Sequence, residues 1–162
     1  MRKSLLVALG LALIASVLAI RVATRPVTAA EPAVHLAGDA APTITVYKSP
    51  TCGCCTKWVE HLREHGFEVV THDTRNVSEV KATSGVPGEL ASCHTAIVDG
   101  YVVEGHVPAD LILRMLKERP EIAGLAVPGM PMGSPGMEGP YAEEYDVVAF
   151  RRDGSTEVYA SR

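Results

Sequence analysis

Three of the four cysteines in the chain lie within one short stretch, Cys52-Gly53-Cys54-Cys55. A β-type apolar run over 43–47 comes just before this stretch, and an apolar helical pattern comes just after it. A cysteine cluster at such a strand-to-helix turn faces the unpaired backbone N–H groups at the start of the helix, which stabilise the thiolate. Because thiolate is the form that binds metal ions and attacks disulfides, the stretch predicts a metal or redox site.

The spacing of these cysteines allows two kinds of chemistry. Cys52 and Cys55 have the C-x-x-C spacing of a redox pair, in which Cys52 would attack a disulfide and Cys55 would resolve it. Cys54 argues against that interpretation, because a third thiol between the pair would compete as the resolving group. Crowded thiolates suit a soft ion instead, such as Cu(I), zinc or an iron–sulfur cluster, and adjacent thiolates can bridge several ions. A structural zinc site would use four ligands in paired knuckles, which this spacing does not provide.

Two further groups of residues carry soft or borderline donors. Cys93 is followed directly by His94, and Met130, Met132 and Met137 lie in a loop rich in glycine and proline. Thioether is a soft ligand for Cu(I) and a poor ligand for zinc, and packing explains methionines in such a loop less well than methionines on a helix. We therefore expect Cys93 and at least one of the three methionines to be metal ligands, with a small core residue as the alternative for Cys93. His94 is a further candidate ligand, although strand alternation points it opposite to Cys93 unless the chain bends there.

The remaining histidines give weaker signals. His61 and His65 are four residues apart on one predicted helix, so they share a face, where solvated polar side chains are the simpler interpretation. His106 precedes a predicted helix, where it could cap the helix or bind a ligand.

The elements that position these side chains alternate along the chain. The patterns predict strands at 43–47, 67–72, 94–98 and 101–104, and helices at 56–65, 76–83 and 108–117. Asp99-Gly100 predicts a hairpin between the third and fourth strands. This order, with a cysteine cluster after the first strand, is typical of the thioredoxin-like plan, an α/β fold with a mixed sheet flanked by helices. The third strand then begins beside the cysteine turn, so Cys93 can reach the cluster.

The sequence divides into four segments. We expect a targeting segment over 1–30, a tether over 31–42 and the thioredoxin-like domain over 43–120. Residues 121–162 would form a C-terminal extension, in which a Gly/Pro/Met-rich metal-binding loop from 124 to 140 has too many breakers for a helix or strand. A β-hairpin of strands 145–150 and 156–160 would close the chain around Asp153-Gly154.

The N-terminus has the layout of a signal peptide. Arg2 and Lys3 precede an apolar run over 5–20, and Thr28-Ala29-Ala30 offers small residues for cleavage. This layout predicts export to the periplasm. The alternative is an uncleaved anchor in the inner membrane, although the run is shorter than the roughly 20 residues that a membrane span needs.

The charge of the chain excludes one class of partner. The first thirty residues carry four of the 15 basic residues and none of the 19 acidic ones, so the rest of the chain is strongly acidic. An acidic domain without a basic stripe argues against nucleic-acid binding.

Five motifs, in order, resemble one known family. They are KSPTCGCC at 48–55, GVP at 85–87, SCHTA at 92–96, EGHVP at 104–108 and GLAVPGMPMGSPGME at 124–138. Together they resemble the exported copper-resistance proteins of CopG type. The resemblance implies a thioredoxin-like domain whose C-terminal extension contributes to metal binding. It also implies a copper site at the CxCC motif, in which thiolates bridge several copper ions, and a role in handling periplasmic copper. Carried over, the ligands are Cys52, Cys54, Cys55 and Cys93, followed by His94, Met130, Met132 and Met137.

Three functions fit these observations. The first is a periplasmic copper-binding protein of copper resistance, which buffers copper or interconverts Cu(I) and Cu(II) as a copper oxidoreductase. The second is a thiol–disulfide oxidoreductase that uses Cys52 and Cys55. The third is a non-enzymatic chaperone that passes copper to efflux components or other copper proteins.

Overall fold

The structure, a computed structural model, describes residues 41–162. The predicted signal peptide and all but the end of the predicted tether lie outside the described residues. Within residues 41–162, no helix is both long enough and apolar enough to cross a membrane.

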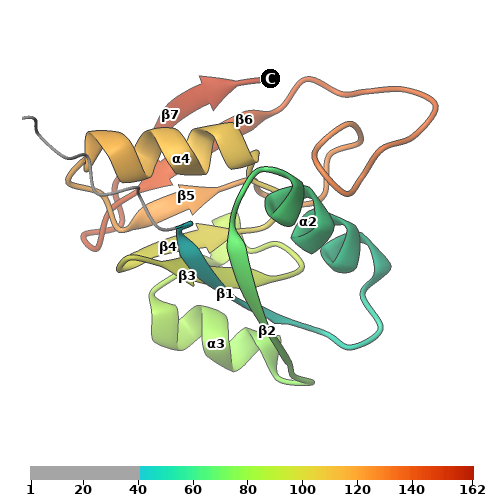
Figure 1. The fold of residues 1–162 in the computed structure, drawn as a ribbon. Coiled ribbons are helices and arrows are strands. Elements are labelled where there is room, and N and C mark those ends of the chain that lie inside the picture. Colours follow the sequence, from blue (N-terminus) through green and yellow to red (C-terminus); the bar gives the residue numbers. More distant parts are fainter. Residues whose placement is uncertain (1–40) are drawn as a thin grey trace, which may run out of the picture. The chain divides into compact units, whose positions relative to one another are not determined.

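The described chain forms one mixed sheet with three α-helices (Figure 1). The strands lie in the order β2-β1-β3-β4-β5-β6-β7, in which the pairs β1–β2 and β4–β5 are parallel and the other pairs are antiparallel. The strands are β1 (Thr43–Lys48), β2 (Glu68–Asp73), β3 (Thr95–Val98), β4 (Tyr101–Glu104), β5 (Gly124–Ala126), β6 (Asp146–Phe150) and β7 (Thr156–Ser161). The helices are α2 (Gly53–Glu64), α3 (Val77–Ser84) and α4 (Ala109–Glu118). This architecture confirms the predicted α/β class with a mixed sheet and matches the thioredoxin-like plan.

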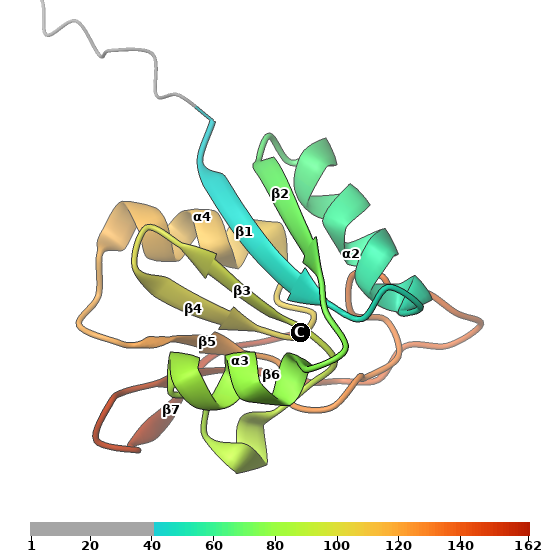
Figure 2. The ribbon, with the colours of Figure 1, turned by 90° about the horizontal axis from the view of Figure 1, so that it is seen from below.

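The helices cover both faces of the sheet. Figures 1 and 2 show α2 and α4 on one face and α3 on the other. The larger core lies under α2 and α4, because their apolar stripes pack on alternate residues of the strands. Its fully buried members include Ile44, Val46, Trp58, Leu62, Ile112, Met115, Leu125 and Ala149. A smaller cluster on the other face contains Leu90, Val102, Ala126 and Phe150. Met115 is thus a core residue, as its helical position predicts.

Helix α2 begins earlier than the prediction of residue 56. It starts at Gly53, so Cys54 and Cys55 lie in its first turn rather than in a loop. The reason is that Cys52 occupies the N-cap position, where its Sγ accepts a hydrogen bond from the backbone N–H of Cys55 at 3.4 Å. Sulfur is not among the usual capping groups, so the sequence signal for this start is weak.

Two other predicted helix starts differ in detail. Pro108 is the N-cap of α4 and not its first helical residue. Asn76 does precede α3, but its side chain donates to the Glu79 carboxylate at 2.6 Å instead of capping the backbone.

The prediction of a loop from 124 to 140 is wrong at its start, because Gly124–Ala126 forms strand β5. Gly124 permits this strand pairing, since a Cβ at this position would lie only 1.9 Å from the carbonyl oxygen of Val102. Strand β5 pairs with β4 on one side and β6 on the other. The predicted C-terminal hairpin, β6 and β7, is present and continues the same sheet.

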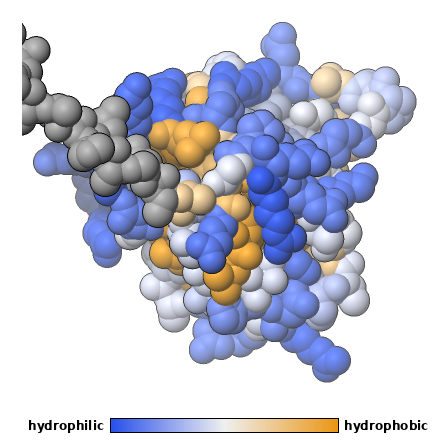
Figure 3. Space-filling view, in the orientation of Figure 1, coloured by the Kyte–Doolittle hydropathy of each residue, from blue (hydrophilic) through white to orange (hydrophobic). Residues whose placement is uncertain are grey.

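The exposed surface is mainly polar. The face seen in Figure 3 has small apolar areas between hydrophilic side chains. Among the described residues, the exposed large apolar side chains are Val70, Leu113, Met130, Tyr141 and Val158.

Candidate metal centre

All four cysteines meet at the N-terminus of α2. Cys52 and Cys55 are joined by a disulfide, with their Cα atoms 5.3 Å apart, and Cys54 and Cys93 are free thiols. One free thiol lies beside each sulfur of the disulfide: Cys54 Sγ is 3.4 Å from Cys52 Sγ, and Cys93 Sγ is 3.4 Å from Cys55 Sγ. The four sulfur atoms all lie within 4.8 Å of one another.

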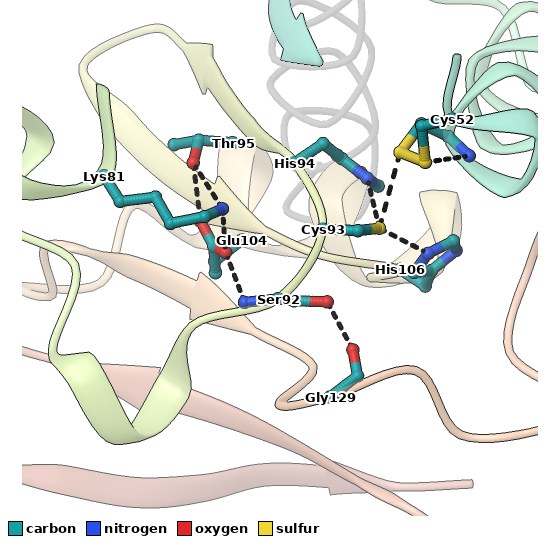
Figure 4. A network of polar contacts seen from close by, with 10 residues as sticks. Cys52, Lys81, Ser92, Cys93, His94, Thr95, Glu104, His106 and Gly129 are labelled. Atoms are coloured by element: carbon teal, nitrogen blue, oxygen red, sulfur yellow. Dashed lines mark hydrogen bonds and ion pairs between the residues drawn. A yellow bond between two sulfur atoms is a disulfide. The ribbon is translucent and has the colours of Figure 1, made fainter. Parts of the chain in front are cut away.

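The sheet register explains how Cys93 reaches the turn. Strand β3 runs antiparallel to β1, and Thr95 at the start of β3 is paired with Tyr47 near the end of β1. Cys93, which lies in the loop just before β3, is therefore at the same edge of the sheet as the turn from β1 into α2. Figure 4 shows its sulfur directed toward the disulfide and the two histidines.

Two buried histidines extend the cluster behind Cys93. Cys93 Sγ lies 3.3 Å from His94 Nδ1 and 3.0 Å from His106 Nε2, and both imidazoles are fully buried. The ligand atoms of these three residues also lie within 4.8 Å of one another. The expected opposite orientation of His94 is wrong, because this residue precedes β3 and strand alternation does not apply to it.

His106 belongs to the cluster, although its position before a helix predicts a cap as well as a ligand. Its Nδ1–H donates to the carbonyl oxygen of Pro135 at 2.7 Å, which leaves Nε2 as the acceptor facing Cys93. A ligand histidine is commonly oriented in this way by a hydrogen bond from its other ring nitrogen. The signal that could have identified it is the EGHVP motif, which places His106 directly after β4, the neighbour of β3.

Burial keeps these groups uncharged in the metal-free protein. Burial and, to a smaller extent, the neighbouring Cys54 together raise the pKa of Cys93 to about 12, although Ser92 and Lys81 act in the opposite direction. Burial also lowers the pKa of His94 well below its ordinary value and lowers the pKa of His106. Neutral imidazoles have the lone pair that a metal ion needs.

The predicted methionine ligands separate into two groups. Met132 and Met137 line a hollow of about 360 Å³ together with Cys54, Lys57 and Glu138. Met130 is 51% exposed and does not line this hollow. Gly136 brings the loop against α2, since a Cβ there would lie 2.6 Å from the Cys54 carbonyl oxygen.

His61, near the end of α2, and His65, which follows α2 as its C-cap, lie away from the cysteines and have structural roles. The backbone N–H of Ala109 donates to His61 Nε2 at 3.1 Å, so His61 caps the start of α4. The Nδ1 of His65 contacts the carbonyl oxygen of His61 at 2.8 Å.

The donor set fits a soft metal ion. It combines four sulfur atoms, two neutral imidazoles and two thioethers that face the Cys54 side, which is the chemistry of copper rather than of magnesium or calcium. His94 Nε2 supports this fit, because it is buried and has no hydrogen-bond partner in the described chain.

Comparisons with known proteins agree with this site. The model of a family described as "Protein of unknown function, DUF411" matches residues 90–137, which include Cys93, His94, His106 and the methionine loop. No match was found among curated proteins.

Two solved structures resemble the chain over most of its length. A structure titled "Copper resistance protein copG- Form 2" is 47% identical, with a TM-score of 0.72, and the match covers 75% of this chain and 98% of that one. A structure titled "Copper resistance protein copG- Form 1" is 48% identical, with a TM-score of 0.70, over 74% of this chain and 96% of that one. Such identity over nearly the whole of each solved chain shows that this protein belongs to the CopG-type family of copper resistance proteins.

Proposed function

We propose that the protein binds copper at the turn between β1 and α2, through the thiolates of Cys52, Cys54, Cys55 and Cys93. The observation that carries the proposal is the convergence of these four sulfur atoms within 4.8 Å of one another, in a family named for copper resistance. His94, His106, Met132 and Met137 supply further donors on either side. Since adjacent thiolates can bridge ions, the site takes more than one copper ion.

The cysteines also give the site a way to change the oxidation state of copper. Two Cu(II) ions each accept one electron from the thiolates of Cys52 and Cys55, which yields two Cu(I) ions and the Cys52–Cys55 disulfide. A dithiol reductant of the exported compartment returns two electrons and two protons and restores the thiols. The disulfide geometry present here, with a 5.3 Å Cα separation, is compatible with this cycle.

The proposal includes a place of action. The signal-peptide layout of the first thirty residues supports export to the periplasm, where the protein would receive copper and release it to efflux components or other copper proteins.

A copper titration of reduced protein under anaerobic conditions tests the proposal. Trp58 is the single tryptophan of the chain, and its ring centroid lies 4.3 Å from that of His94, so its fluorescence reports copper at this site. We expect Cu(I) to quench this fluorescence and at least one copper ion per chain to remain after desalting. Cys93→Ser should reduce the retained copper and weaken the quenching.

The matched control is His65→Gln, because His65 caps the C-terminal end of the helix that begins at the cysteine turn and lies outside the cluster. It should retain as much copper as the unmodified chain. Fewer than one tightly held copper ion per chain, or equal retention in Cys93→Ser, would contradict the proposal.

The disulfide favours a second candidate function, thiol–disulfide exchange with partner proteins. Here Cys52 attacks a partner's disulfide, which releases one partner thiol and forms a mixed disulfide. Cys55 then attacks Cys52, which releases the reduced partner and leaves the Cys52–Cys55 disulfide. Insulin reduction by metal-free protein, with a dithiol as electron donor, separates the two functions. Turnover that is lost in Cys52→Ser supports exchange, and its absence in the unmodified protein excludes it.

A further inference from the structure

A buried ion pair lies directly behind Cys93. Glu104, at the end of β4, is fully buried, and its Oε1 accepts a hydrogen bond from Lys81 Nζ of α3 at 2.6 Å. The Lys81 side chain is itself only 14% exposed. Neither residue contacts a sulfur atom of the cluster; Lys81 acts directly on the cluster only through its charge, which opposes the rise in the pKa of Cys93.

The Glu104 carboxylate holds the residues on both sides of Cys93. Besides Lys81, it accepts the backbone N–H of Ser92 at 2.6 Å and the hydroxyl of Thr95 at 2.7 Å. Ser92 immediately precedes Cys93, and Thr95 follows it by two residues. Figure 4 shows these contacts meeting at the Glu104 carboxylate, with the backbone N–H of Ser92, the residue before Cys93, at one end of the network.

The same network reaches the C-terminal loop. The hydroxyl of Ser92 donates to the carbonyl oxygen of Gly129, which lies next to the methionine segment. Gly105 makes room for this contact, because a Cβ there would lie 2.5 Å from Ser92 Oγ and 2.7 Å from the Val127 carbonyl oxygen. Ser92 is therefore fixed between the ion pair and the loop that covers the copper site.

Stability alone does not account for this ion pair. A buried ion pair often contributes little net stability, since the cost of removing both charges from water offsets their attraction. Helix α3 has no buried residue, so Lys81 does not belong to an apolar packing face. A carboxylate that is bound by three fixed donors does, however, restrict the segment that it holds to a single arrangement.

We propose that the Lys81–Glu104 ion pair is a positioning element for Cys93. By fixing Ser92 and Thr95, it holds the Cys93 sulfur at 3.0 Å from His106 and 3.4 Å from Cys55. Lys81 and Glu104 are positioning residues and not ligands. The inference rests on the proposed function only where copper is measured, because the placement of the thiol can be tested without copper.

The test uses the double variant Lys81→Met/Glu104→Gln. It removes both charges together, so no uncompensated charge is left in the interior and the net charge near Cys93 does not change. In the reduced, metal-free protein, each cysteine is alkylated with a limiting amount of iodoacetamide and quantified by peptide mass spectrometry. We expect the rate at Cys93, relative to that at Cys54, to rise by roughly tenfold, the effect of losing a hydrogen bond to a charged group.

Asp99→Asn is the matched control. Asp99 pairs with Arg119 at the far end of the same β3–β4 hairpin, so its ion pair is broken without affecting the Cys93 end. The alkylation ratio should stay within about twofold of the unmodified protein. Thr95→Val is a second test, because it removes one of the two contacts through which Glu104 holds the segment around Cys93 while keeping a side chain of similar shape; it should raise the ratio severalfold.

The same variants are then titrated with Cu(I) against a competing chelator. The double variant should bind copper about tenfold more weakly than the unmodified protein and Asp99→Asn. An unchanged alkylation ratio in the folded double variant would overturn the inference; if that variant does not fold, an unchanged ratio in Thr95→Val would overturn it. If the ratio rises while the unmodified protein binds no copper, the proposed function fails and the positioning role stands.

Discussion

Each free thiol of the cluster lies against a different sulfur of the disulfide. Cys54 lies beside Cys52, and Cys93 lies beside Cys55. Reduction of the single disulfide therefore gives four neighbouring thiols. Two buried imidazoles adjoin only Cys93, and two methionines adjoin only Cys54. The site is therefore asymmetric, with fully buried nitrogen donors beside Cys93 and partly exposed thioethers beside Cys54.

At the scale of single residues, the sequence identified the cysteines but could not identify the groups that hold them. Spacing alone shows that Cys52, Cys54 and Cys55 lie in one turn, and the strand order indicates that Cys93 reaches them. The ion pair between Lys81 and Glu104 joins residues 23 positions apart through a buried contact, for which neither residue has a local signal. His106 was similarly ambiguous, because its position before a helix suits a cap as well as a ligand.

His61 makes the stability of the metal-free protein depend on pH. Burial, followed by the charge of His65, lowers the pKa of His61 below its ordinary value of 6.5, while Glu138, Glu64 and Asp110 oppose this effect. The unfolded chain therefore binds more protons than the folded chain between the two pKa values. The contribution of His61 to the free energy of unfolding is therefore complete above pH 6.5, and it declines as the pH falls from 6.5 toward the lower pKa of the folded state.

We accordingly expect the free energy of unfolding of the metal-free protein to decrease from pH 7.5 to pH 5. His61→Gln should decrease less steeply over the same range, because it loses the titrating cap of α4, and should be less stable at pH 7.5 by about 1 kcal/mol. Urea unfolding at several pH values gives both results. Parallel pH curves for the two proteins would show that His61 does not contribute this dependence.

At the scale of elements, the prediction was accurate where periodicity and turns determine the outcome. The order of strands and helices up to residue 118 follows from apolar patterns, the Asp99-Gly100 turn and Pro108. It failed at β5, because Gly124 pairs through a close approach to Val102 that only the neighbouring strand reveals. It also placed the start of α2 too late, because a cysteine sulfur caps the helix.

The contact between the methionine loop and α2 depends on Gly136. This glycine has a φ of +87°, and a Cβ at this position would lie 2.6 Å from the Cys54 carbonyl oxygen and 2.9 Å from the backbone nitrogen of Trp58. Gly136→Ala should lower the free energy of unfolding by about 1–3 kcal/mol through strain and overpacking, and should make Cys54 more accessible. Denaturant unfolding and alkylation of Cys54 measure these effects.

Gly129→Ala is the control for this variant. Gly129 also has a positive φ, of +67°, but a Cβ there would have no neighbour within 4 Å. It should therefore show only the cost of the backbone conformation, roughly 1 kcal/mol, with no change at Cys54. Equal effects of the two substitutions would mean that Gly136 matters only for its backbone conformation.

At the scale of the whole molecule, the C-terminal extension completes the sheet as well as covering the site. Strands β5, β6 and β7 follow β4 without a break, and the larger core includes Leu125, Val147 and Ala149. The sequence predicted the hairpin and the loop but could not show that they extend the same sheet, since strand order is a long-range property.

Removal of residues 121–162 should therefore destroy the fold. The truncated chain exposes the edge of β4 and loses the apolar side chains of β5 and β6 from both cores, so we expect no cooperative unfolding transition. A chain of residues 41–162 serves as the comparison and should unfold cooperatively in urea. A cooperative transition in residues 41–120 would instead establish that segment as an independent domain.

The central claim is that copper binds at the four sulfur atoms, and anomalous diffraction tests it most directly. Crystals of reduced protein soaked with Cu(I) would be measured on both sides of the copper absorption edge. The account predicts anomalous peaks at bonding distance from the sulfurs of Cys54 and Cys93, with at least one also bonded to Cys52 or Cys55. Copper peaks located only elsewhere on the molecule, with the four sulfurs free of metal, would contradict it.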